Sequence, residues 1–122
     1  MQLRIFFGIL AVAIGLLGAA ATQAGDADFT LVNGTGYDIR EVYISPNNRE
    51  NWGRDRLGDG TLDNNKSRLF KFSDNANCRQ DIKVVFDDNN SEVIWKNFDL
   101  CALDKITLKY NRATKTVTAV TE

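Results

Sequence analysis

The chain has 122 residues, 43% of them hydrophobic and 25% charged, and its 15 basic and 16 acidic residues give a net charge of −1. This length suits a single domain, and the lack of a clustered basic excess argues against a nucleic-acid-binding surface. The sequence contains no histidine, which excludes Ser-His-Asp and Cys-His catalytic groups and the commonest zinc sites.

The first 24 residues have the three regions of a secretory signal peptide. Arg4 precedes an uncharged apolar run, residues 5–17, and small residues follow it. Cleavage after either Ala21 or Ala24 satisfies the small-residue rule. We therefore expect an exported domain at 25–122, periplasmic or secreted, with no stable membrane anchor after cleavage. A retained anchor is the alternative, because the uncharged stretch at residues 5–21 has a length at the lower end of the range that spans a bilayer.

Short runs with β-strand character, separated by polar turns, make up the rest of the chain. They are residues 29–32, 37–44, 66–72, 82–86, 93–98, 105–110 and 114–120. About seven strands at these spacings predict a small antiparallel β-sandwich with one disulfide. A small closed β-barrel is the alternative architecture.

The second of these runs is irregular. Ile39 is out of phase with Val42 and Ile44, which predicts a β-bulge between them. Pro46, the only proline, should end this strand because it has no N–H to donate to the sheet.

A long polar connection, residues 45–65, follows this strand. Loops of this length in compact domains are usually functional or contain a short helical turn, and residues 51–57 are the best candidate for one. We expect Trp52, Leu57 and Leu62 to pin the connection to the core.

The two cysteines flank a predicted β-hairpin. If Asn89 and Asn90 form a two-residue turn, Cys78 and Cys101 lie opposite each other, within the separation that a disulfide needs. The apolar phase changes near Asn97, which predicts a second bulge and offsets the cysteines by one position. In an exported chain such a pair is typical of a structural disulfide rather than a redox or metal site.

The connection also carries the strongest candidates for catalysis. Asp55, Asp59 and Asp63 recur every four residues, and paired carboxylates serve acid–base hydrolysis. That spacing aligns them only on a helix, which Gly58 and Gly60 disfavour. Solvated carboxylates that make local turn bonds and ion pairs explain the same pattern.

One motif resembles a calcium loop. Asp87, Asn89 and Ser91 match the first three ligand positions of an EF-hand, but Glu92 and Phe98 stand where that loop requires Gly and Glu. A hairpin turn explains these residues without a metal. The sequence therefore predicts neither a metal site nor a cofactor.

A binding surface is the main functional hypothesis. Arg49, Trp52, Arg54 and Arg56 lie in the 45–65 connection, and Arg and aromatic side chains dominate the energetics of protein interfaces. For Trp52 the alternative is a core anchor beneath the loop.

Three segments together resemble a family of small exported bacterial proteins without an established activity. They are F-T-L-V-N-G-T-G-Y-D-I-R-E-V-Y-I-S-P at 29–46, W-G-R-D-R-L-G at 52–58 and C-R-Q-D-I-K-V-V-F-D-D at 78–88. Such sequences usually have Asn-Gly where this chain has Asn64-Asn65. Some members carry the label argininosuccinate lyase, which these residues do not support, because that enzyme class is a much larger helical protein.

Together these observations predict an exported cell-envelope binding or structural module without catalytic activity. Its partner would be an envelope or extracellular protein or ligand that the sequence does not identify. The alternative function is a small carboxylate-based hydrolase or lyase that uses Asp55 and Asp59.

Overall fold

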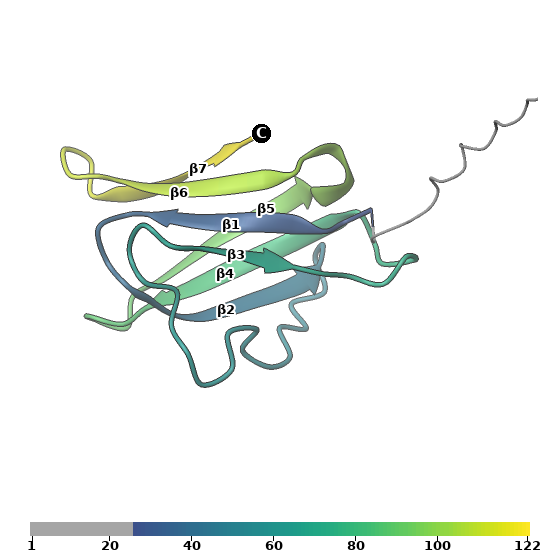
Figure 1. Cartoon of the computed structure of the whole chain (residues 1–122), viewed down its shortest axis with the longest axis horizontal. Coiled ribbons are helices and arrows are strands. Elements are labelled where there is room, and N and C mark those ends of the chain that lie inside the picture. Colours follow the sequence, from purple (N-terminus) through teal and green to yellow (C-terminus); the bar gives the residue numbers. More distant parts are fainter. Residues whose placement is uncertain (1–25) are drawn as a thin grey trace, which may run out of the picture.

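The computed structural model describes residues 26–122, in which seven β-strands form two stacked sheets (Figure 1). The four-stranded sheet has the order β3-β1-β6-β7, and the three-stranded sheet has the order β2-β4-β5. The elements are β1 (Phe29–Gly34), β2 (Ile39–Pro46), β3 (Ser67–Phe70), β4 (Arg79–Phe86), β5 (Glu92–Asp99), the 3₁₀ turn η2 (Leu100–Ala102), β6 (Lys105–Asn111) and β7 (Thr116–Thr121). The predicted seven-stranded sandwich is confirmed, and the two sheets remain separate rather than closing into one barrel.

One strand pair departs from the predicted antiparallel arrangement. β1 and β6 run parallel, with Leu31 opposite Ile106, whereas the other four pairs are antiparallel. Parallel neighbours need a long crossover, and here the chain builds all of the second sheet between β1 and β6. A hairpin pattern in the sequence indicates only that two consecutive strands pair, so it could not predict the pairing of β1 with β6.

The core lies between the two sheets and takes alternate residues from the strands. Phe29 anchors one side of it, with its ring centroid 5.6 Å from that of Phe70 and 6.3 Å from that of Phe72. The core side chains that are at most 1% exposed are Ala27, Phe29, Leu31, Ile39, Val42, Ile82, Val84, Leu100, Ile106 and Leu108. Burial of each large apolar side chain contributes about 1.5–3 kcal/mol, which makes this layer the main source of stability.

The predicted bulge in β2 is confirmed. The pairing of β2 with β4 shifts between Ile39 and Glu41. The extra residue brings Val42 and Ile44 to the same face as Ile39, and all three side chains are at most 3% exposed. The strand ends at Pro46, as predicted.

The turn of the β4–β5 hairpin is longer than predicted. The N–H of Phe86 donates to the carbonyl of Ser91 at 2.9 Å, which leaves the four-residue loop 87–90 between them. The prediction of a two-residue turn at Asn89 and Asn90 is therefore wrong. Asn90 does adopt the expected positive φ, at 60°, but it closes a longer loop.

The bulge predicted near Asn97 is also confirmed. The β4–β5 pairing shifts between Gln80 and Ile82, and Asn97 lies at this step with a φ of 66°. The longer turn changes which residues of β4 and β5 face each other, and the extra residue at this bulge brings the pairing at Gln80 and Phe98 one position closer to the predicted one.

The predicted disulfide between Cys78 and Cys101 is formed, with a Cα–Cα separation of 5.2 Å. The carbonyl of Cys78 accepts a hydrogen bond from the N–H of Leu100 at 2.8 Å, so Cys101 lies one position beyond the facing residue. The disulfide thus joins the start of β4 to η2, and it clamps the open end of the hairpin.

Two turns depend on a left-handed backbone conformation. Gly36 has a φ of 91° in the β1–β2 turn, and a Cβ at nearby Gly34 would lie 3.0 Å from the carbonyl oxygen of Leu108. Asn65 has a φ of 69° before β3. Asn tolerates this conformation, and Gly adopts it readily.

The predicted signal peptide at 1–24, with both cleavage positions and the alternative of a retained anchor, lies outside the described residues. Among residues 26–122, no helix is long and apolar enough to cross a membrane.

Replacement of both cysteines by serine should lower the free energy of unfolding by about 2–5 kcal/mol, because the disulfide closes a long loop in the unfolded chain. Urea unfolding of the double variant and of the oxidised protein measures the difference. A thiol titration of the native protein that finds two free thiols would contradict the disulfide.

Candidate functional site

The connection between β2 and β3 covers the open edge of β2. The N–H of Arg56 donates to the carbonyl of Val42 at 2.7 Å, and the N–H of Val42 donates to the Asp55 carboxylate at 2.9 Å. Further along, Leu62 forms an isolated antiparallel bridge with Ile39. The connection is therefore held like an extra strand, and the helical turn predicted at 51–57 is wrong.

Asp81 fixes the start of this connection. Its side chain is fully buried, and its carboxylate accepts hydrogen bonds from the side-chain amide of Asn47 at 2.8 Å and from the N–H groups of Asn48 and Asn97 at 2.9 and 2.8 Å. The Lys96 ammonium lies 3.6 Å away. Burial alone would raise the pKa of Asp81, but the three hydrogen bonds and Lys96 outweigh burial, so the pKa is lowered.

Asp55 fixes the middle of the connection. One oxygen of its carboxylate accepts from the N–H groups of both Val42 and Leu57, each at 2.9 Å. The side chains of Leu57 and Leu62 enter the core at 4% and 3% exposure, which confirms both predicted anchors. Asp55 therefore holds the backbone of the connection against β2.

The other loop carboxylates are placed differently. Asp59 is exposed, and Asp63 accepts a hydrogen bond from the hydroxyl of Thr61 at 2.6 Å. Asp55 lines a surface hollow together with Arg54, and Asp59 is not among the residues that line it. The geometry thus gives Asp55 and Asp59 separate surroundings, and the hydrolase or lyase alternative stays a prediction.

Trp52 lies on the outer face of the three-stranded sheet and is not part of the core cluster. It is half-buried, and the Lys83 ammonium lies 5.1 Å from its ring and 4.8 Å from the ring of Tyr43. Lys83 alternates with the inward-facing Ile82 and Val84, so this contact is on the side of the sheet away from the core. The expectation that Trp52 pins the loop to the core is wrong, because a cation–π contact holds it outside.

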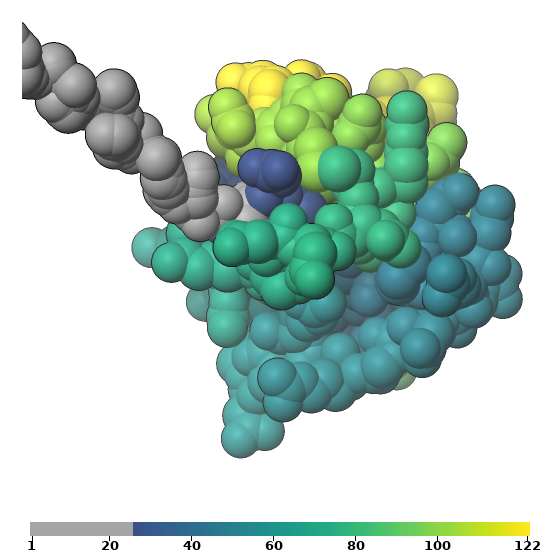
Figure 2. All heavy atoms as spheres, turned by 90° about the vertical axis from the view of Figure 1, so that its right-hand side faces the viewer, coloured from purple at the N-terminus to yellow at the C-terminus, as the bar shows by residue number. Residues whose placement is uncertain are grey.

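Two adjoining hollows bring the predicted contact residues together. Trp52, Arg54 and Arg56 line the first, which has a volume of about 410 Å³. Arg54 and Arg56 also line the second, of about 250 Å³, together with Arg68 from β3. Arg49 is exposed but lines neither hollow. Figure 2 looks at the end of the sandwich where β2 ends, with the connection across its lower part. We call the surface formed by Trp52, Arg54, Arg56 and Arg68 the arginine surface.

The positive charges of this surface are close together. The Arg56 guanidinium lies 5.3 Å from the centre of the Phe72 ring, and burial, followed by repulsion from Arg54, lowers the pKa of Arg56. Among residues 26–122, the ion pairs within 4 Å do not include Arg54, Arg56 or Arg68. An anionic group in the first hollow would therefore meet guanidinium groups that no carboxylate neutralises at that distance, whereas the lining of the second hollow also includes Asp55.

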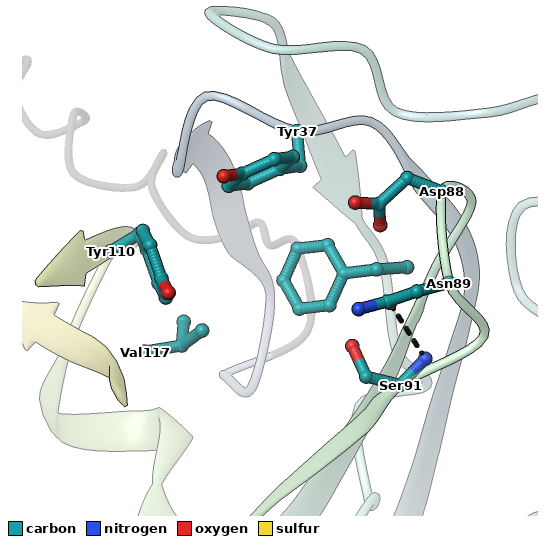
Figure 3. A pocket seen from close by; sticks show the side chains of 7 residues that line it. Tyr37, Asp88, Asn89, Ser91, Tyr110 and Val117 are labelled. Carbon is teal, nitrogen blue, oxygen red and sulfur yellow. Dashed lines mark hydrogen bonds between the residues drawn. The ribbon is translucent and has the colours of Figure 1, made fainter. Parts of the chain in front are cut away.

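A smaller pocket lies between the β1–β2 turn, the β4–β5 loop and the side chains of Tyr110 in β6 and Val117 in β7 (Figure 3). Tyr37, Tyr110, Asp88, Asn89 and Ser91 line it, and its volume is about 120 Å³. Tyr37, Asp88 and Tyr110 were not among the site residues predicted from the sequence. No local pattern could have joined them, because each comes from a different loop or strand.

Neither cysteine is available as a metal ligand. Within the part of the chain that the structure describes, the group of ligand side chains close enough to share an ion is Cys78, Asp99 and Cys101, and the two sulfurs are bonded to each other. The residues of the calcium-like motif belong to the β4–β5 hairpin loop, where the side-chain oxygen of Asn89 accepts from the N–H of Ser91 at 3.0 Å.

The fold and these surfaces define a small disulfide-bonded β-sandwich with surface hollows along its edge and a smaller pocket at one end. Comparisons of the chain with models of protein families, with curated proteins and with solved structures found no match. The resemblance to small exported bacterial proteins stays a prediction.

Asp81 should make stability dependent on pH. Its pKa is lower in the folded state than the value of about 4 in an unfolded chain, so the ionised carboxylate stabilises the fold above about pH 4. This contribution is lost as the pH falls through the lower, folded-state pKa. The Asp81→Asn variant should lose about 1–3 kcal/mol at pH 7, because its amide group faces hydrogen-bond donors.

Urea unfolding at a series of pH values measures this effect, and the deficit of Asp81→Asn should shrink below about pH 4. Asp74→Asn, at an exposed turn, is the control and should follow the native protein. A deficit that is the same at all pH values would argue against the ionised carboxylate as its source.

Asp55 and Asp59 provide a second test. Asp55→Ala should lower the free energy of unfolding by about 1–3 kcal/mol, because two N–H groups lose their acceptor. The matched variant Asp59→Ala, at an exposed position, should stay within about 0.5 kcal/mol of the native protein. Equal losses in denaturant unfolding would show that Asp55 has no special role in holding the loop.

Proposed function

We propose that this chain is an exported binding module of the bacterial cell envelope, without catalytic activity, that recognises an acidic partner through the arginine surface. The observation that carries the proposal is the pair Arg54 and Arg56, which line both hollows and have no carboxylate within ion-pairing distance among residues 26–122. Arg pairs with carboxylate or phosphate groups through two parallel hydrogen bonds, so unneutralised guanidinium groups favour a partner of this charge.

The way in which the loop is held supports a binding role. Asp81, Asp55 and Leu62 fix the connection at its start, middle and end, so its backbone is held in one shape before a partner binds. A preorganised surface loses less conformational entropy when a partner binds, and the affinity is correspondingly higher. Trp52 beside the arginines adds the aromatic area that interface centres commonly have.

Export is supported by the predicted signal peptide and by the disulfide. Disulfides persist in oxidising compartments such as the periplasm or the extracellular space.

Capture from envelope extract tests the proposal. Arg54→Ala and Trp52→Ala should each weaken retention of the partner about tenfold or more, because central Arg and Trp contacts contribute more than 1 kcal/mol. Arg112→Ala removes an exposed arginine from the β6–β7 turn and is the matched control. Increasing salt should release the partner from the native protein.

The proposal would be contradicted if Arg54→Ala retained the partner as well as the native protein does, or if Arg112→Ala weakened its retention equally. Circular dichroism of each variant shows that the fold is retained.

A further inference from the structure

Three of the seven residues that line the pocket at the loop end of the sandwich are aromatic. Tyr37 comes from the β1–β2 turn, Phe86 from the end of β4 and Tyr110 from β6. The rings of Tyr37 and Tyr110 meet edge to face, with their centroids 5.6 Å apart and an interplanar angle of 86°. Figure 3 shows the two tyrosines on neighbouring walls of the same space.

The position of Tyr37 is fixed from behind by buried polar groups. Asn33 is fully buried, and its side-chain amide donates to the carbonyl of Tyr37 at 2.7 Å and to that of Leu62 at 2.9 Å. The hydroxyl of Thr35 lies 2.7 Å from the side-chain oxygen of Asn33 and 3.0 Å from the carbonyl of Tyr37. These bonds fix the backbone of the turn that carries Tyr37, and the residue itself is 39% exposed.

The opposite wall is tied to the same turn. The N–H of Asp87 donates to the carbonyl of Asp38 at 3.0 Å, which joins the β4–β5 loop to the residue after Tyr37. Within the loop, the bond between Asn89 and Ser91 fixes the chain that carries Asp88. The aromatic and acidic walls are thus held at a set separation.

Asp88 is the ionisable acid on the wall. In Figure 3 its carboxylate is turned towards the space below Tyr37. Across residues 26–122, no ion pair or side-chain hydrogen bond engages it, and its charge faces the pocket unpaired. A carboxylate together with aromatic faces, which carry partial negative charge, makes the pocket attractive to a cation.

We propose that this pocket binds a small organic cation, a quaternary or alkylated ammonium group, between Tyr37, Phe86 and Tyr110, with Asp88 as its counter-ion. Aromatic faces stabilise such groups within about 6 Å of the ring centre. The pocket admits only the cationic end of a ligand, because drug-sized ligands need about 300 Å³ or more. An adjoining hollow of about 490 Å³, which shares Tyr110 and Asn89 with the pocket, has room for the rest of the molecule.

Choline and dimethylbutanol, its uncharged isostere in which carbon replaces nitrogen, provide the test. Choline is titrated into the nitrogen-labelled full chain, with its disulfide intact, and the NMR chemical shifts of the backbone amides are followed. The amide signals of Tyr37 and residues 88–91 should shift. Choline should bind at least about fivefold more tightly than the isostere. Equal binding of the two would show a merely apolar hollow and overturn the proposal, and so would tighter binding of a neutral sugar such as glucose.

Variants locate the site. Tyr37→Leu and Asp88→Asn should each weaken choline binding about fivefold or more, and neither replaces a core residue. Asp87→Asn, which changes a neighbouring exposed carboxylate that does not line the pocket, is the matched control and should bind choline normally. Choline binding that survives in both Tyr37→Leu and Asp88→Asn would overturn the assignment.

The test is independent of the arginine surface. Arg54→Ala should bind choline as the native protein does, because Arg54 lines neither the pocket nor the hollow beside it. A loss of choline binding in Arg54→Ala would contradict the location of the site.

Discussion

Strand β2 lies at the edge of its sheet, and its outward N–H and C=O groups need hydrogen-bond partners that no further strand supplies. The connection to β3 supplies them: Asp55 and Arg56 satisfy Val42, and Leu62 pairs with Ile39. This requirement explains why the connection is long and yet held in place. It also explains how a segment rich in polar residues acquires a fixed shape, which then orients the side chains of the arginine surface.

The features of the fold that were predictable from the sequence are local. Side chains alternate between the two faces of a strand, so a break in the apolar alternation predicts a bulge. Breaks between Ile39 and Val42 and near Asn97 predicted the two bulges of the structure. The cysteine pair was predictable from the pairing of residues across the hairpin, although the turn has four residues rather than the two that the prediction assumed. That turn was missed because Asp87 and Asn90 suit a four-residue loop as well as a shorter one.

The candidate sites were predictable only where one segment builds them. Trp52, Arg54 and Arg56 lie within a few residues of each other, so composition alone pointed to them, but the contribution of Arg68 required the packing of β3. The pocket of Tyr37 and Tyr110 joins residues that are far apart in sequence, through a parallel strand pair that hairpin patterns do not show. Asp55, a predicted candidate for catalysis, accepts hydrogen bonds from the backbone N–H groups of Val42 and Leu57, which only the folded structure reveals.

The hydrophobic core fixes the sheets, but buried polar groups fix the loops. Asn33, Ser45 and Asp81 lie in strands, and each is fully buried. Each bonds to a loop: Asn33 to the turn of Tyr37, Ser45 to the N–H of Asn51, and Asp81 to Asn47 and Asn48. An apolar side chain at any of these positions would leave loop donors or acceptors unpaired, at a cost of about 1–3 kcal/mol each. Asn33 thus holds the turn that carries Tyr37, and Asp81 holds the start of the connection that carries the arginine surface, so separate buried groups fix the two candidate surfaces.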